Sequence, residues 1–187
     1  MLVTKPQPHL HPREYFAGEE PAEAGQAPVW AVHTKPRAEK KLARFCEMAG
    51  VGHFLPTMLS RRTYGNRSVR TSWLPVFPGY LFLLQETFEK VALLRSNAVV
   101  QFMRVPRPAE LYADLQTLWM ALVARPSAVQ EALFRPGVKV EVVAGALKGV
   151  RGELVESRKG GMRLLIKVHL FERAVSVEVD AAQVRRV

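Results

Sequence analysis

The segment Trp73–Leu84 (WLPVFPGYLFLL) constrains the fold most, because it is the densest apolar run in an otherwise basic chain. Prolines and a glycine restrict the backbone of its first half, and residues 80–84 have the length of a strand buried on both faces. We therefore predict a sharp turn that leads into a central strand. Leu81 to Leu84 are expected in the core, whereas Phe77 and Tyr80 flank the turn, where a rigid backbone can hold aromatic rings at the surface.

The composition describes a soluble globular protein with a basic surface. The chain has 187 residues, 48% of them hydrophobic, and a formal net charge of +10, enough for one large domain or two small ones. It contains no segment typical of a membrane helix, no secretory signal pattern and only one cysteine, Cys46, so we expect a cytoplasmic protein without disulfides. The charge suits a partner that carries phosphates or an acidic surface.

Residues 1–28 differ in composition from the rest of the chain. They are net acidic and contain five prolines, which predicts a disordered leader. His9 and His11 form a His-x-His pair, but no third ligand accompanies them, so we assign no metal site to this segment. The basic excess therefore belongs to the folded parts that follow.

The first folded part begins with a predicted strand at residues 29–33. Pro36 then suits the first turn of a helix, where its missing N–H costs nothing. Apolar residues recur along this helix at helical spacing, namely Ala38, Leu42, Phe45 and Ala49. Cys46 borders this stripe, and no basic or His neighbour is placed by the sequence to activate its thiol, so we interpret it as a packing residue.

Basic side chains gather at and just before this helix: Lys35, Arg37, Lys40, Lys41 and Arg44. They form either a solvated charged face or a contact for nucleic acid. Only Glu39 and Glu47 interrupt them, which favours the second interpretation.

Residues 58–70 are predicted as a β-hairpin with Gly65-Asn66 at its turn. The hairpin carries four arginines and no acidic residue: Arg61, Arg62, Arg67 and Arg70. A solvated surface ribbon is the alternative, but an acid-free arginine cluster on a projecting ribbon is well suited to contact a phosphate backbone.

The remaining elements complete an α+β sandwich, with helices packed on a mostly antiparallel sheet. We predict a short helix capped by Thr87, a strand at residues 98–103, and a strong helix on which leucines recur at positions 111, 115, 118 and 122. The first domain therefore spans residues 29–124, and residues 125–135 are predicted to be a linker.

Residues 136–187 are predicted to be all β. Valines alternate with polar residues in four or five short strands, and glycines separate them at regular spacing, which suits a small closed barrel. Because β-branched residues and glycines disfavour a helix, we expect this part to be a permanent β-barrel.

Several motifs, taken in chain order, resemble those of the NusG family of transcription elongation factors. Thr34-Lys35-Pro36-Arg37-Ala38-Glu39 and Phe77-Pro78-Gly79-Tyr80 resemble its N-terminal (NGN) domain, and residues 135–155 resemble a KOW motif. The resemblance covers residues 29–187 and implies an NGN-type α/β sandwich followed by an SH3-like KOW barrel. Residues 61–66 and 105–108 look more like the specialised paralogues of the family (RfaH-, UpxY- and LoaP-like). Phe171-Glu172-Arg173 departs from the usual Phe-Gly-Arg of the KOW domain.

The resemblance implies a factor that suppresses pausing or termination. Its first domain would bind the clamp helices of RNA polymerase through His33, Phe77 and Tyr80. The basic residues would face the non-template DNA strand. The KOW domain would recruit a ribosomal protein or the termination factor Rho, with Phe171 and Arg173 at partner-binding positions. We expect a monomer.

Other function classes are less compatible with the sequence. The chain offers no Cys/His metal spacing, no order of residues typical of a catalytic triad and no paired carboxylates in a motif, so we predict no catalytic residue, metal or cofactor. Gly145, Gly149 and Gly152 are interpreted as turn glycines rather than a phosphate loop. A ribosome-associated KOW protein that binds RNA remains the alternative, and it would not need the first domain.

Overall fold

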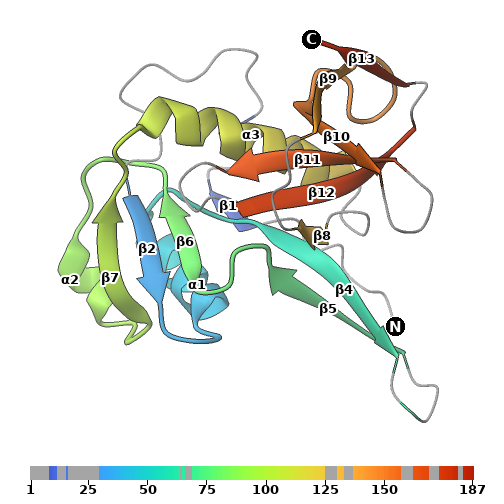
Figure 1. The fold of residues 1–187 in the computed structure, drawn as a ribbon. Coiled ribbons are helices and arrows are strands. Elements are labelled where there is room, and N and C mark those ends of the chain that lie inside the picture. Colours follow the sequence, from blue (N-terminus) through green and yellow to red (C-terminus); the bar gives the residue numbers. More distant parts are fainter. Residues whose placement is uncertain are drawn as a thin grey trace. The chain divides into compact units, whose positions relative to one another are not determined.

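The computed structural model describes residues 9–11, 16, 30–63, 65, 69–124, 130–132, 137–156, 162–168, 173–180 and 183–187. The chain has an α+β fold that divides into two compact units, Met1–Thr57 with Trp73–Tyr112 and Met58–Ser72 with Ala113–Val187 (Figure 1). None of the helices in these ranges is long and apolar enough to span a membrane. The domain boundaries predicted from the sequence, 29–124 and 136–187, remain a proposal.

A five-stranded antiparallel sheet forms the centre of the first unit, in the order β1-β3-β6-β2-β7. Its strands are β1 (His9–His11), β3 (His53–Leu55), β6 (Tyr80–Leu83), β2 (Trp30–Thr34) and β7 (Val99–Arg104). The prediction of a central strand is confirmed, because β6 lies in the middle of the sheet and Leu81, Phe82 and Leu83 are buried.

Helices α1 (Glu39–Met48) and α2 (Lys90–Leu94) contribute to the core on one face of this sheet. Leu42, Ala43 and Cys46 of α1 pack with Val32 and Leu81. The buried stripe of α1 therefore differs from the predicted one by part of a helical turn. Of the predicted residues, Ala38 and Phe45 are only half-buried, and Ala49 is exposed. Cys46 is a packing residue, as expected, with no exposed surface, and this burial raises the pKa of its thiol to about 12.

Two helix starts differ from the prediction. Pro36 lies in a turn that precedes α1, which begins at Glu39 after a cap at Ala38. Helix α2 begins at Lys90 with Glu89 at its cap and no side-chain capping bond, so Thr87 is not its cap. Neither helix start has a side-chain capping hydrogen bond.

Aromatic rings cluster on the other face of the sheet. Phe54 and Phe82 lie opposite each other on β3 and β6, and Phe16 packs edge-on against Phe54, with ring centroids 5.2 Å apart. Phe16 also contacts Tyr112. The prediction that residues 1–28 are disordered was thus wrong for residues 9–11 and 16, because His9–His11 pair with β3 and Phe16 is buried; the other residues of this segment lie outside the described ranges.

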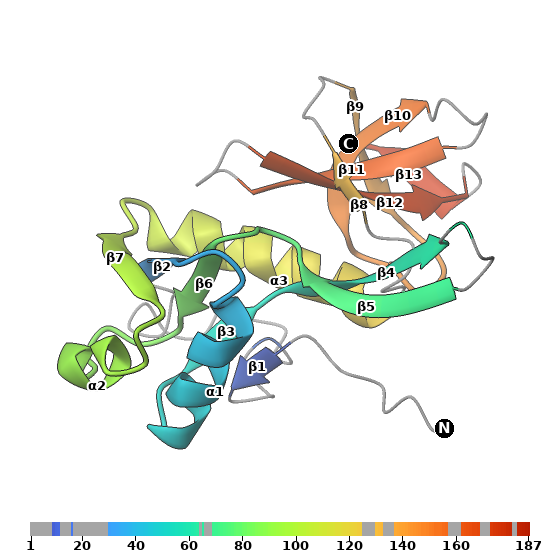
Figure 2. The ribbon, with the colours of Figure 1, turned by 90° about the horizontal axis from the view of Figure 1, so that it is seen from below.

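The predicted hairpin is confirmed. Strands β4 (Thr57–Thr63) and β5 (Val69–Pro75) form a two-stranded sheet and run alongside each other (Figure 2). The strong helix is α3 (Pro108–Ala124), and its four periodic leucines are buried.

The C-terminal sheet has six antiparallel strands in the order β13-β9-β10-β11-β12-β8. These are β13 (Val184–Arg186), β9 (Val138–Val142), β10 (Arg151–Glu156), β11 (Met162–Val168), β12 (Arg173–Val179) and β8 (Gln130–Ala132). Its core includes Val140, Val142, Leu164, Ile166 and Val177. As expected, the described part of residues 137–187 contains no α-helix.

Two details of this sheet differ from the prediction. Strand β8 lies within the predicted linker and pairs with β12, so residues 130–132 belong to the sheet. Gly145 and Gly149 are turn glycines with φ values of +81° and +87°, whereas Gly152 lies in β10. A Cβ atom on Gly152 would clash with the Leu165 carbonyl oxygen, so glycine is required there by close strand packing rather than by a turn.

Candidate functional site

A stacked pair of rings lies at one end of the N-terminal sheet. His33 on β2 is directly opposite Tyr80 on β6, and their ring centroids are 5.2 Å apart with 22° between the planes. Both residues are half-buried, so each ring keeps part of its surface exposed. Cross-strand aromatic pairs of this kind are rigid, and partly exposed rings can serve as anchors for a partner protein.

The turn before β6 positions Tyr80. Gly79 has a φ of +84°, which glycine adopts without strain, and the position of a Cβ atom there would be 3.6 Å from the Cδ2 atom of His33. The Gly79 carbonyl accepts a hydrogen bond of 2.8 Å from the Thr34 N–H, and the Tyr80 N–H donates to the Phe77 carbonyl at 3.1 Å. The turn therefore lies directly against the end of β2.

Glu39, the first residue of α1, is hydrogen-bonded to this turn. Its Oε1 atom accepts a hydrogen bond of 2.8 Å from the Gly79 N–H, and the residue is only 5% exposed. A buried carboxyl group is costly unless it is hydrogen-bonded. Glu39 was not predicted to belong to the site.

Phe77 does not belong to the exposed surface, contrary to the prediction. It is 1% exposed, and its ring packs edge-on against Phe82 with centroids 6.1 Å apart. The turn directs this ring toward the apolar face of the sheet, where burying it is more favourable than exposing it to water.

Basic side chains lie along α1 and in the segment between β2 and α1. Lys35, Arg37, Lys41 and Arg44 are exposed, whereas Lys40 is half-buried. The Lys40 Nζ atom donates to the Trp73 carbonyl at 2.7 Å, which ties α1 to β5. Lys40 is therefore a half-buried member of the predicted basic set whose amine has a structural role.

Two backbone positions in this region are unusual. Arg37 and Asn97 have φ values of +62° and +54°, although neither is a glycine. Asn97 accepts a hydrogen bond of 2.6 Å from Lys35 Nζ, and the Lys35 N–H donates to the Ala98 carbonyl. Asparagine tolerates this conformation, whereas arginine is strained in it.

The other predicted site residues can be placed only in part. Arg61 and Arg62 lie on β4 and Arg173 on β12, but their side chains are outside the described part of the structure. Arg70 is exposed on β5. Arg67 and Phe171 lie outside the described residues.

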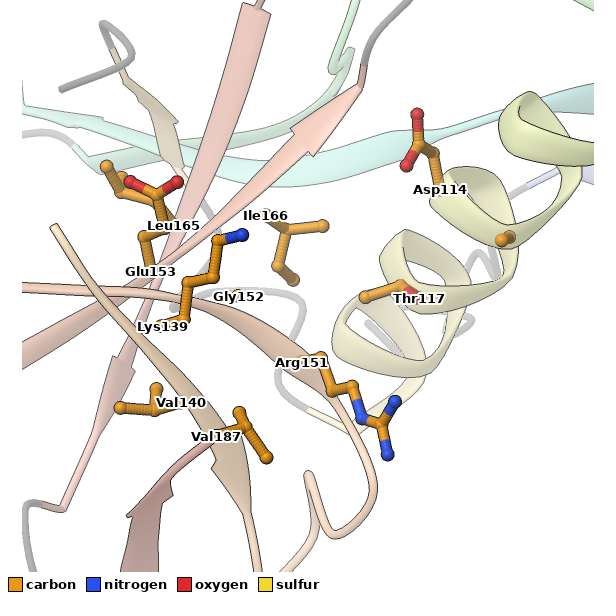
Figure 3. A pocket seen from close by; sticks show the side chains of 11 residues that line it. Asp114, Thr117, Lys139, Val140, Arg151, Gly152, Glu153, Leu165, Ile166 and Val187 are labelled. Carbon is orange, nitrogen blue, oxygen red and sulfur yellow. The ribbon is translucent and has the colours of Figure 1, made fainter. Parts of the chain in front are cut away.

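The second unit contains a cavity of about 550 Å³, lined by residues of α3, β9, β10 and β11 and by Val187 (Figure 3). Two of its charged groups have local partners: Glu153 accepts a hydrogen bond from the Gly137 N–H at 2.7 Å, and Arg151 pairs with Glu141 at 3.2 Å. Among the residues that the structure describes, no group of three or more His, Cys, Asp or Glu side chains could hold a metal ion. The arrangement with the clearest chemistry is the stacked ring pair, whose partly exposed surface can contact a partner.

Comparison with known proteins gives one family match and several similar solved structures. Residues 30–115 match the model of the family described as "Transcription termination factor nusG". No curated protein is significantly similar in sequence. Similar solved structures include one titled "Domain interaction in Thermotoga maritima NusG" (17% identity, 85% of this chain and 97% of that chain covered, TM-score 0.45). Another is titled "Crystal Structure of MjSpt4:Spt5 complex conformation B" (18% identity, 85% and 96% covered, TM-score 0.26).

Proposed function

We propose that this chain, whose residues 30–115 match the NusG family model, is a transcription elongation factor that binds RNA polymerase through His33 and Tyr80. The single observation that carries the proposal is the position of this stacked pair. It lies within the family-matched segment, at the same end of the sheet as the exposed Lys35 and Arg37. The resemblance assigns polymerase binding to these two ring positions, and both keep exposed surface.

Binding of this kind requires few residues. A small number of aromatic anchors usually carries most of the energy of a protein interface. Preferential binding to the closed clamp would shift the polymerase toward that state and thereby suppress pausing or termination. The factor would act without chemistry of its own.

The exposed basic residues supply a second contact in this proposal. Lys35, Arg37, Lys41 and Arg44 would face the non-template DNA strand, and the hairpin arginines would add to this contact. Cations that neutralise phosphates release counterions, so this part of the binding should weaken as salt increases. Lys40 is omitted from the proposed contact, because it is half-buried and its amine is bound to the Trp73 carbonyl, whereas Lys35 is exposed.

The C-terminal sheet is proposed to be a KOW domain over residues 136–187. Its six short antiparallel strands are compatible with this assignment. In the proposal it recruits a ribosomal protein or Rho, with Phe171 and Arg173 at the contact. The factor would work in the cytoplasm, either on all operons or on a dedicated one.

Co-purification tests the proposed function against the ribosomal alternative. The full chain, carrying an affinity tag, is expressed in its own cells and purified after nuclease treatment, which removes bridging nucleic acid. We expect the subunits of RNA polymerase to co-purify with it. Recovery of ribosomal subunits without polymerase would contradict the proposal and support the RNA-binding alternative.

A further inference from the structure

Glu39 occupies an unusual environment for an acidic residue in a basic region. It is the first residue of α1, it is 5% exposed, and it accepts a hydrogen bond of 2.8 Å from the Gly79 N–H. Acidic side chains are rarely buried without a partner, because removal from water is costly. This hydrogen bond reaches the turn that precedes Tyr80, and Gly79 is 40 residues away from Glu39 in the chain.

Both backbone polar groups of Gly79 are hydrogen-bonded. Glu39 accepts from its N–H, and its carbonyl accepts from the Thr34 N–H at 2.8 Å. Gly79 also lies close to the His33 ring: a Cβ atom added to Gly79 would be 3.6 Å from the Cδ2 atom of His33. A shift of Gly79 would therefore move the start of β6, where Tyr80 stacks on His33.

We infer that Glu39 is a positioning residue for the polymerase-binding pair His33 and Tyr80. Through its hydrogen bond to the Gly79 N–H it fixes the turn that precedes Tyr80, and thereby the orientation of the two rings. This inference rests on the proposed function, because it explains how the binding surface is held in shape before the partner arrives. Preorganisation of this kind strengthens binding by reducing the ordering cost.

Whether Glu39 holds the turn at Gly79 in place can be tested without polymerase. We would compare Glu39→Ala, Glu39→Gln and the control Glu47→Ala, which removes an exposed acid from the same helix, by NMR of the full chain. Glu39→Ala should shift the Gly79 amide proton upfield and change the ring signals of His33 and Tyr80. Glu39→Gln keeps an acceptor oxygen and should restore most of these signals. Unchanged Gly79 and ring signals in Glu39→Ala would overturn the inference.

A double-mutant cycle tests whether Glu39 acts through the rings. Loss of a hydrogen bond to a charged group predicts that Glu39→Ala weakens polymerase binding by roughly tenfold in the otherwise wild-type chain. In the Tyr80→Ala background the same change should have a much smaller effect, because the ring that it positions is absent. Equal effects in both backgrounds would mean that Glu39 contributes only to stability, and would overturn the inference.

The two experiments separate this inference from the function on which it rests. If Tyr80→Ala leaves polymerase affinity unchanged, the proposed binding site is wrong, and the role of Glu39 in polymerase binding fails with it. The NMR signals then still decide whether Glu39 holds the turn. If Tyr80→Ala weakens binding but Glu39→Ala changes neither affinity nor spectrum, only the inference fails.

Discussion

At the scale of single residues, Arg37 of the proposed DNA contact has a strained backbone conformation. Its φ of +62° is a conformation that costs a residue with a Cβ atom about 1 kcal/mol. We expect Arg37→Gly to raise the free energy of unfolding by about 1 kcal/mol, because glycine removes this cost. Chemical denaturation followed by circular dichroism measures the change.

The matched control for this prediction is Arg37→Ala, which removes the same charge but keeps the strain. Both variants should bind DNA in an elongation complex more weakly than the wild type, whereas only the glycine variant should be more stable. Equal stability of the two variants would show that the strain is absent in solution.

Single residues also show where sequence reasoning reached its limit. His33 and Tyr80 were predicted from motifs, and the strand register places them opposite each other. The orientation of Phe77 was not predictable, because a ring beside a turn can point to either face and only packing against Phe82 decides it. Glu39 was missed because its burial depends on a Gly79 N–H from a distant segment.

At the scale of elements, Cys46 packs α1 against the sheet, and its thiol loses its proton only at high pH. Burial raises the pKa of Cys46 from 9.0 to about 12. The raised pKa means that the folded state favours the neutral thiol. The stabilisation is therefore complete below pH 9, where the unfolded chain also keeps its proton, and is lost as the pH rises from 9 toward 12.

We expect the stability advantage of the wild type over Cys46→Ala to shrink by on the order of 1–2 kcal/mol between about pH 8 and about pH 10.5. Urea unfolding of both proteins at each pH gives the four free energies that are needed. Lysines and tyrosines titrate in the same range, but they are common to both proteins and cancel in the difference. A constant difference would show that the Cys46 thiol is accessible to water in the folded state.

The β4–β5 hairpin carries a prediction about salt dependence. Replacing Arg61, Arg62, Arg67 and Arg70 with Gln should reduce the slope of log K against log salt by about 0.7 for each lost contact to single-stranded DNA. The measurement is a titration of the full chain onto an elongation complex at several salt concentrations. An unchanged slope would show that these arginines are only solvated.

The elements differ in how well the sequence predicts them. Strand β6, the hairpin and α3 follow from strong local patterns, and the valine alternation of β9 and β12 is equally clear. Strands β1 and β8 have three residues each and are stabilised by pairing with β3 and β12, which no local pattern reveals. The start of α1 was misplaced because Pro36 fits a turn as well as a helix.

At the scale of the whole molecule, the chain combines a mixed α/β unit with a strand-rich unit. The fold class was predicted from the sequence, because the two halves have different periodicities. The division between the units was harder to predict, since residues 58–72 and 113–124 group with the C-terminal residues. Such grouping depends on contacts between segments that are far apart in the sequence, so tests of function should use the full chain.

Binding of the full chain to RNA polymerase, measured for the wild type and Tyr80→Ala, tests the proposed function most directly. Because Tyr80 is half-buried and stacked on His33, it should act as an anchor whose loss costs roughly 1–3 kcal/mol of binding free energy. The control is Val91→Ala, which shortens an exposed apolar side chain on α2 of the same unit and should leave the affinity unchanged. We predict weaker binding for Tyr80→Ala alone; equal affinities for Tyr80→Ala and the wild type would contradict the assignment of this ring pair as the polymerase-binding surface.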